Sequence, residues 1–186
     1  MKNFPIKSKE SKASFFATGF IVIISMWIIV GAAEVTTYVF LKTVLLITLS
    51  YVAMIYDLST KRIPNALVLS MIFGWLILVI PMVYIDIENG IRILTDSIYG
   101  LLIGGGMFLL VYLLSKKGLG GGDVKFMAAA GLYLGFAHTI PAILFGTVLA
   151  AIAGLVLILL KKIEKKDRIP LAPFLFIGIM ITVFMP

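Results

Sequence analysis

The hydrophobic positions of this chain gather into long, nearly uninterrupted runs, and charged residues lie mainly in the short segments between them. Seven apolar runs stand out, at positions 14–33, 37–56, 65–85, 91–114, 124–137, 139–160 and 170–185. Because a helix needs about 20 apolar residues to cross a bilayer, this pattern predicts an all-α polytopic membrane protein, a bundle of about six to seven transmembrane helices. The fifth run is short and the seventh contains Pro173, so these two are expected to be tilted or re-entrant.

The basic residues predict how these helices are oriented, because Lys and Arg accumulate in cytoplasmic loops. Of the 16 Lys and Arg residues, 14 fall on alternate loops and therefore on one side of the membrane. These are Lys2, Lys7, Lys9, Lys12, Lys61, Arg62, Lys116, Lys117, Lys125, Lys161, Lys162, Lys165, Lys166 and Arg168. We expect a multi-pass plasma-membrane protein whose N-terminus is cytoplasmic and whose C-terminus, after seven crossings, is external.

Composition narrows the class of protein further. Of the 186 residues, 61% are hydrophobic and 13% are charged; the net charge is +7 and the mean hydropathy is +1.13. Such a chain is neither disordered nor an ordinary soluble domain, and its scattered basic clusters form no face for nucleic acid. The absence of cysteine excludes disulfides, thiol nucleophiles and Cys-bound zinc, and His138 is the only histidine. We expect no metal and no cofactor.

The chain contains no repeat, linker or low-complexity segment, so residues 1–186 are interpreted as a single membrane-embedded domain. Residues 1–36 are interpreted as an additional N-terminal signal-anchor helix. Their basic start, apolar run and small residues Gly31-Ala32-Ala33 also resemble a cleavable signal peptide. Cleavage would leave the orientation of the following helices unchanged.

Acidic residues beside the apolar runs are the candidates for chemistry, because an ionised carboxylate near hydrocarbon is costly. Asp86 is expected in an external loop, and Asp96, four residues after Arg92, is expected in a structural ion pair or hydrogen bond. Asp57 and Asp123 each lie where a run meets a basic loop, and the two crossings between them return them to the same side. They form either a shared-proton dyad that activates water and protonates a scissile carbonyl, or two interfacial aspartates paired with Lys and Arg.

The glycines before Asp123 favour the dyad. The segment Gly118-Leu119-Gly120-Gly121-Gly122 removes side chains at the start of a helix, so that backbone and carboxylate can approach a substrate closely. A glycine-rich helix start also binds phosphate in some proteins, but no Gly-Lys-Ser/Thr follows here, and the carboxylate would repel an anion. Asp123 is also suited to cap the helix that follows it, a role compatible with catalysis.

Two short segments carry a family resemblance. One is Asp57 followed by Arg62-Ile63-Pro64-Asn65, and the other is Gly120-Gly121-Gly122-Asp123-Val124-Lys125, which matches Gly-x-Gly-Asp-x-Lys. Together they resemble the type IV prepilin and preflagellin leader peptidases, which are membrane aspartic proteases of the GxGD class. The later run Pro170-Leu171-Ala172-Pro173-Phe174 is similar to a segment of the bacterial members, and the similarity extends over roughly residues 45 to 180.

This resemblance implies a membrane aspartic endopeptidase that removes the short basic leader peptide from type IV prepilin, pilin-like or preflagellin (archaellin) precursors. Cleavage would follow a glycine on the cytoplasmic side. Asp57 and Asp123 would be the catalytic pair, and Gly120 and Gly122 would shape the loop that presents Asp123. The remaining motif positions, expected to support the site, are Arg62, Ile63, Pro64, Asn65 and Lys125.

The chain departs from the larger bacterial members, which carry a Cys-x-x-Cys segment and methylate the new N-terminus. Because it has no cysteine, we expect peptidase activity, with no methyltransferase domain. The expected partners are pilin-like precursors and membrane lipid; no oligomeric state is indicated. Two alternatives stay open: an intramembrane protease of the presenilin or signal-peptide-peptidase type, which Tyr56-Asp57 also fits, and a non-enzymatic transporter or assembly subunit.

Overall fold

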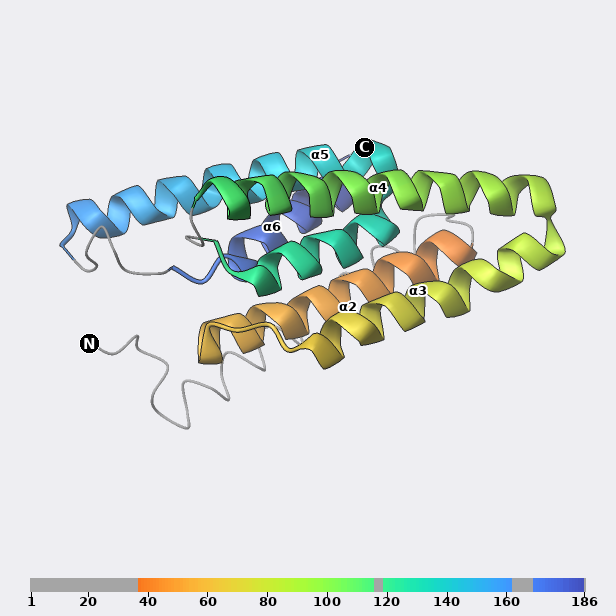
Figure 1. Cartoon of the computed structure of the whole chain (residues 1–186), viewed down its shortest axis with the longest axis horizontal. Coiled ribbons are helices and arrows are strands. Elements are labelled where there is room, and N and C mark those ends of the chain that lie inside the picture. Colours follow the sequence, from red (N-terminus) through yellow and green to blue (C-terminus); the bar gives the residue numbers. More distant parts are fainter. Residues whose placement is uncertain (1–36, 116–118, 162–168, 186) are drawn as a thin grey trace. The chain divides into compact units, whose positions relative to one another are not determined.

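The computed structural model describes residues 37–115, 119–161 and 169–185, and these residues are helical with short connections (Figure 1). One compact unit begins at Leu41, within the first of the helices below, and contains the rest of that helix and all the later ones. The helices are α2 (Thr37–Thr60), α3 (Asn65–Ile85), α4 (Ile87–Leu114), α5 (Gly121–Leu159) and α6 (Ala172–Phe184). Within the described residues there is no strand, which confirms the all-α prediction.

The described part of the chain contains fewer helices of membrane-spanning length than the six to seven predicted. Among the described residues, α2, α3, α4 and α5 are long and apolar enough to cross a membrane, and α6 is a shorter apolar helix. The predicted run at 14–33, with the proposed signal anchor at 1–36, lies outside the described residues. The fifth and sixth predicted runs fall together in α5.

A break at Gly135 divides α5 into two arms, which correspond to the fifth and sixth predicted runs. Gly135 has φ 72° and ψ −174° inside α5, a conformation that glycine adopts readily and other residues do not. Figure 1 shows α5 doubling back on itself, so its two arms run in opposite directions. The sequence placed this interruption at His138; the structure places it at Gly135, where Asp96 Oδ1 accepts a hydrogen bond of 3.0 Å from the Phe136 N–H.

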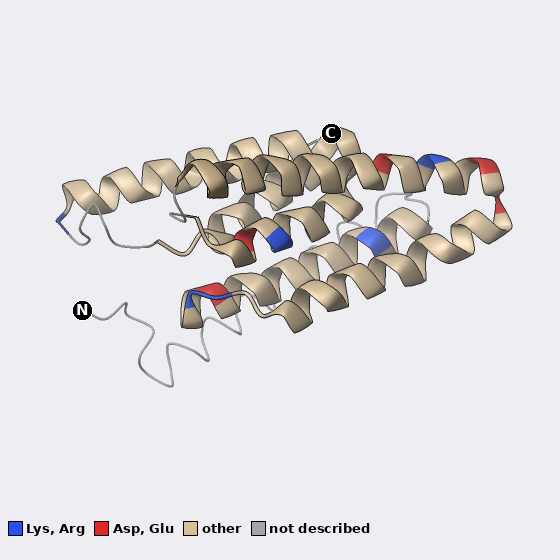
Figure 2. Ribbon diagram, viewed as in Figure 1, with Lys and Arg blue, Asp and Glu red and all other residues tan. Residues whose placement is uncertain are grey.

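The surface of the helices is what a lipid environment requires. Large apolar side chains such as Phe73, Ile77 and Leu110 are exposed on α3 and α4. Figure 2 shows the charged residues of the described helices mostly toward the two ends, with uncharged residues between them. An exposed apolar band between charged ends is typical of a membrane protein.

Glycines set the closest approach between helices. A Cβ atom added at Gly100 would collide with the carbonyl oxygen of Gly131, and one added at Gly131 would collide with that of Gly100. A Cβ at Gly104 would likewise meet the carbonyl oxygen of Met127. Small residues let helix backbones pack in direct contact within a membrane, so these glycines position the first arm of α5 against α4.

Two buried hydrogen bonds hold α3 in this arrangement. The Trp75 Nε1–H donates to Ser97 Oγ at 3.2 Å, which joins α3 to α4. The Tyr133 hydroxyl donates to the carbonyl oxygen of Met71, which joins α5 to α3. Because buried polar groups are costly without partners, these bonds favour this helix arrangement over alternatives.

Asp86 separates α3 from α4 and caps the second of them. Its Oδ1 accepts from the Asn89 backbone N–H at 3.1 Å, and its Oδ2 accepts from Asn89 Nδ2 at 2.7 Å. These side-chain and backbone bonds from Asn89 lower the pKa of Asp86 below its usual value. The cap also explains why α4 begins at Ile87, four residues before the predicted run.

The lowered pKa of Asp86 determines how the stability contributed by this cap changes with pH. A carboxylate whose pKa is lower in the folded state contributes stability above its unfolded pKa of about 3.9, and that contribution is lost as the pH falls through the folded value. We therefore expect Asp86→Ala to lower the apparent melting temperature in detergent at pH 7 and to matter less near pH 3. An equal effect at both pH values would contradict the role of the carboxylate charge.

Candidate active site

Asp57 and Asp123 line the same cavity, of about 330 Å³, although α3 and α4 separate them in sequence. The two carboxyl groups interact electrostatically. The lining residues are Asp57, Lys61, Arg62, Ile63, Gly120, Gly121, Gly122 and Asp123. The acidic positions of the two motifs are thus brought together at one end of the helices, as the even number of intervening crossings predicted.

Asp57 lies in the last turn of α2 and is 5% exposed. Its Oδ2 accepts a hydrogen bond of 2.9 Å from the backbone N–H of Ala172, the first residue of α6. The backbone of Leu171 adds a further hydrogen bond to this carboxyl group. Sequence reasoning missed these donors. The available signal was the pair Pro170 and Pro173, which lack N–H groups and leave Leu171 and Ala172 to supply the amides at this helix start.

Asp123 lies in the first turn of α5, and its backbone N–H donates to the Gly120 carbonyl oxygen at 3.1 Å. A Cβ added at Gly120 would lie 2.7 Å from Asp123 Oδ2, and one added at Gly122 would lie 3.2 Å from Ile63 Cβ. A Cβ at Gly121 would meet nothing within 4 Å. An alanine at position 120 would displace the Asp123 carboxyl group and one at position 122 would crowd Ile63, whereas position 121 has space for a side chain.

Asn65 and Lys125 join the two motifs through a direct contact. Lys125 Nζ donates to Asn65 Oδ1 at 3.0 Å, which ties the start of α3 to the first arm of α5. Ile63 is buried beside Gly122, and Pro64 precedes α3 as its N-cap residue with φ −69°. Pro64, Asn65 and Lys125 do not line the cavity; they fix the loop that does.

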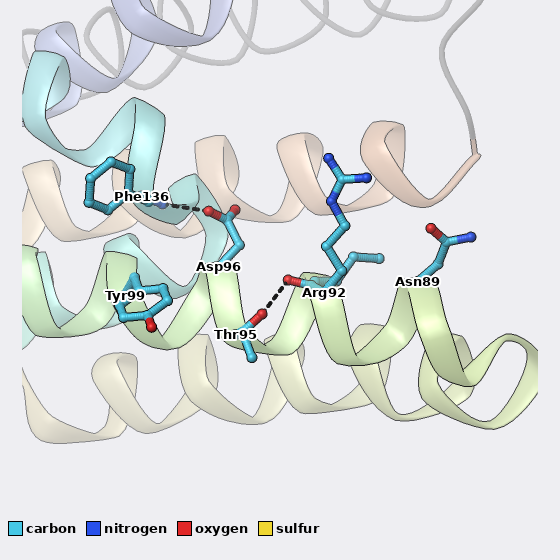
Figure 3. Close-up of a pocket in the computed structure, with 7 residues that line it drawn as sticks. Asn89, Arg92, Thr95, Asp96, Tyr99 and Phe136 are labelled. Carbon is cyan, nitrogen blue, oxygen red and sulfur yellow. Dashed lines mark hydrogen bonds between the residues drawn. The ribbon is translucent and has the colours of Figure 1, made fainter.

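A larger cavity, of about 760 Å³, lies at the other end of α4 (Figure 3). Its acidic residue, Asp96, points toward the backbone of Phe136 and accepts its N–H. The expectation of a structural hydrogen bond for Asp96 is therefore confirmed. Because this carboxylate caps the second arm of α5 and no second carboxylate is found among the described residues that line the cavity, the smaller cavity is the candidate active site. Within the described part of the chain, no group of three or more His, Cys, Asp or Glu residues is placed to hold a metal ion.

Comparison with known families supports this choice. The model of the type IV leader peptidase family matches residues 43–155, more than half of the chain. The chain belongs to the type IV leader peptidase family. The match contains both aspartates and the two motifs of the cavity, but ends before α6, whose first residue contacts Asp57.

Several relatives in this family are about one third identical to the chain over the aligned residues. The prepilin leader peptidase/N-methyltransferase of Escherichia coli (strain K12) is 33% identical over 153 residues, covering 80% of this chain and 63% of that protein. The protein of the same name from Aeromonas salmonicida (strain A449) is 31% identical over 140 residues, 72% of this chain and 46% of its own length. The leader peptidase HopD of Salmonella typhimurium is 31% identical over 142 residues, 71% of this chain and 86% of that protein. The chain thus spans about half to two thirds of the leader peptidase/N-methyltransferases, and no solved structure matches it.

Proposed function

We propose that the chain is a membrane aspartic endopeptidase that removes the short basic leader from type IV prepilin, pilin-like or archaellin precursors, cutting after a glycine. Family membership and the relatives named prepilin leader peptidase support the reaction class. The observation that carries the proposal for this chain is the cavity that Asp57 and Asp123 line together. The proposal is confined to peptidase activity and includes no methyltransferase activity.

The proposed mechanism uses the two carboxyl groups as a general acid and base. Two carboxylates that share a small site do not both ionise readily, so one keeps a proton. The ionised member removes a proton from water, which attacks the scissile carbonyl carbon, while the protonated member donates to the carbonyl oxygen. Gly120 supports this role because the absence of a Cβ leaves space for the Asp123 carboxyl group, and Gly121 leaves open space in the cavity wall.

Substrate binding follows from the position of the cavity at the end of apolar helices. The apolar segment of a precursor would stay in the bilayer while its leader reaches the cavity. Lys61 and Arg62 line the cavity and repel a basic leader, so we propose that anionic lipid headgroups help to hold it. The acidic residues that the sequence offers on this side, Glu10, Glu164 and Asp167, lie outside the described residues.

We propose that the cavity faces the cytoplasm, because it lies at the end that carries the basic clusters. With single cysteines introduced as Lys61→Cys, Lys116→Cys or Lys162→Cys, we expect a membrane-impermeant maleimide to label only inside-out vesicles. Glu88→Cys, at the other end of α4, is the matched control and should label only right-side-out cells. Labelling of Lys61→Cys from outside would overturn the orientation.

The glycine loop gives a prediction with an internal control. Gly120→Ala places a Cβ against the Asp123 carboxyl group, whereas Gly121→Ala places one in open space. We expect precursor cleavage to fall by about tenfold or more in Gly120→Ala, since a small misplacement of a catalytic group costs up to about 10²-fold. Gly121→Ala should cleave at nearly the wild-type rate; equal losses in both variants would contradict this account of the loop.

Co-expression tests the proposed function in a cell. A bacterial host that lacks its own prepilin peptidase would carry this chain together with a pilin-like precursor encoded near its gene. We expect a shortened product whose new N-terminus, read by mass spectrometry, begins directly after a glycine. A precursor that stays full length across a panel of such substrates, with the chain present in the membrane, would contradict the proposal.

A further inference from the structure

The two carboxyl groups of the cavity have different surroundings. The Asp57 carboxyl group accepts hydrogen bonds from the backbone of Ala172, at 2.9 Å, and of Leu171. Both amides belong to the start of α6, a helix of 13 residues whose N-terminus carries partial positive charge. Amide donors and a helix N-terminus both favour the ionised form of a carboxyl group.

Lys61 adds a positive charge near the Asp57 carboxyl group. The α2 helix ends at Thr60, and the Lys61 backbone N–H still donates to the Asp57 carbonyl oxygen at 2.8 Å. Lys61 has φ 53°, a left-handed conformation that favours glycine and is costly for a lysine. This backbone places a lysine in the cavity wall, where its charge interacts with that of Asp57.

Burial disfavours a negative charge on both carboxyl groups, and Asp123 has fewer donors than Asp57 to offset it. The Asp123 carboxyl group accepts a hydrogen bond from the Gly120 backbone, and the negative charge of Asp57 repels a negative charge on Asp123. Repulsion between like charges favours one proton on the pair, and the weaker donor set of Asp123 makes it the site for that proton.

We infer that Asp57 is the ionised base of the dyad, held by the Leu171 and Ala172 amides as positioning groups, and that Asp123 is the protonated acid. This inference rests on the proposed function and assigns a separate role to each aspartate. It also explains the Pro170–Pro173 segment, because its prolines start α6 at the point where the first free amides of the helix meet Asp57.

With these roles, each aspartate returns to its starting protonation state after one catalytic cycle. Water adds its oxygen to the carbonyl carbon and its proton to Asp57, while the proton of Asp123 passes to the carbonyl oxygen, which gives a neutral gem-diol. The C–N bond then breaks as Asp57 gives its proton to the leaving amine nitrogen, and one diol hydroxyl returns a proton to Asp123. The dyad ends with Asp57 ionised and Asp123 protonated, as it began.

Replacing one backbone N–H tests the inference with little change in shape. Lactic acid incorporated at position 172 by nonsense suppression exchanges the N–H that binds Asp57 for an ester oxygen. The matched control is leucic acid at position 175, whose N–H donates to the Leu171 carbonyl oxygen in the same turn and does not contact Asp57. Both proteins are assayed in full length, in detergent or nanodiscs, against a precursor that the wild type cleaves.

We expect the ester at position 172 to move the acidic limb of the kcat/KM profile upward by about one pH unit or more, because a hydrogen bond to a charged group is lost. At pH values below the acidic limb, the ester at position 172 should cleave about tenfold more slowly than the wild type. The ester at position 175 should leave the limb at its wild-type pH. The charged groups that face Asp57 across the cavity, Lys61, Arg62 and Asp123, are the same in both proteins. An unchanged acidic limb with lactic acid at position 172, or an equal shift with leucic acid at position 175, would overturn the inference.

A second readout needs no substrate and separates this inference from the proposed function. Infrared titration of the protein with ¹³C-labelled aspartate reports protonated carboxyl groups, and Asp57→Asn identifies the band of Asp57. We expect this band only after acidification, at a higher pH in the 172 ester than in the wild type. A protonated Asp57 at neutral pH would refute the inference even in an active peptidase. Failure of every precursor to be cleaved, with the infrared result as expected, would refute the proposed function alone.

Discussion

Asp57→Asn and Asp123→Asn are each expected to lower precursor cleavage by about 10²- to 10⁴-fold, the contribution of a general acid or base. An asparagine at position 57 cannot take a proton from water, and one at position 123 cannot supply a proton to the carbonyl oxygen. Since both carboxyl groups act in the same step, the double variant should be little worse than either single variant.

The fold should tolerate both substitutions, which makes the loss of rate interpretable. Asparagine has nearly the shape of aspartate, and an amide oxygen at position 57 can still accept the Ala172 N–H. Asp86→Asn is the matched control, because this acidic residue is exposed at the opposite end of α4 and asparagine also caps helices well. Undiminished cleavage by Asp57→Asn or Asp123→Asn would remove that residue from the mechanism, and comparable losses in Asp86→Asn would point to a general effect on folding.

Gly131→Ala is expected to destabilise the protein by about 2 kcal/mol, in the range for overpacking a tight interior. Its new methyl group would collide with the Gly100 backbone, which, unlike the end of a flexible side chain, cannot move aside cheaply. The first arm of α5 also carries Asp123, so a shift of this arm away from α4 should lower cleavage as well as stability.

Gly106→Ala is the matched control in α4, because a Cβ at this position meets nothing within 4 Å. Alanine is a better helix former than glycine by about 1 kcal/mol, so this variant should be as stable as the wild type or slightly more stable. The apparent melting temperature in detergent measures both variants. Equal melting temperatures for Gly131→Ala and Gly106→Ala would show that the α4–α5 crossing is not as close as described.

Most of the helices could be predicted from the sequence, because the lengths of the apolar runs and the proline or charged residues between them determine where helices begin and end. The run at 65–85 coincides with α3, since Pro64 stands before it and Asp86 after it. The reversal inside α5 was misplaced at His138 because α5 contains several glycines, and no sequence pattern shows which one adopts a positive φ. That choice depends on Asp96, which reaches the Phe136 N–H from another helix.

In the candidate site, too, features that depend on motif spacing could be predicted, whereas contacts between residues far apart in the sequence could not. Motif spacing and the number of crossings predicted that Asp57 and Asp123 lie at the same end of the helices, and the structure places both on one cavity. The bond between Lys125 and Asn65 was not predictable, because it joins residues far apart in sequence. The amide of Ala172 was missed for another reason: every residue except proline has a backbone donor, so its residue type carries no signal.

A cleavage assay with purified protein decides whether the chain is an aspartic peptidase that uses Asp57 and Asp123. Wild type, Asp57→Asn, Asp123→Asn and Asp86→Asn would be mixed separately with one pilin-like precursor, and the new N-terminus would be read by mass spectrometry. We expect a single cut after a glycine by wild type and Asp86→Asn, and none at equal time by the other two. The same cut made at the wild-type rate by Asp57→Asn or Asp123→Asn would contradict this expectation.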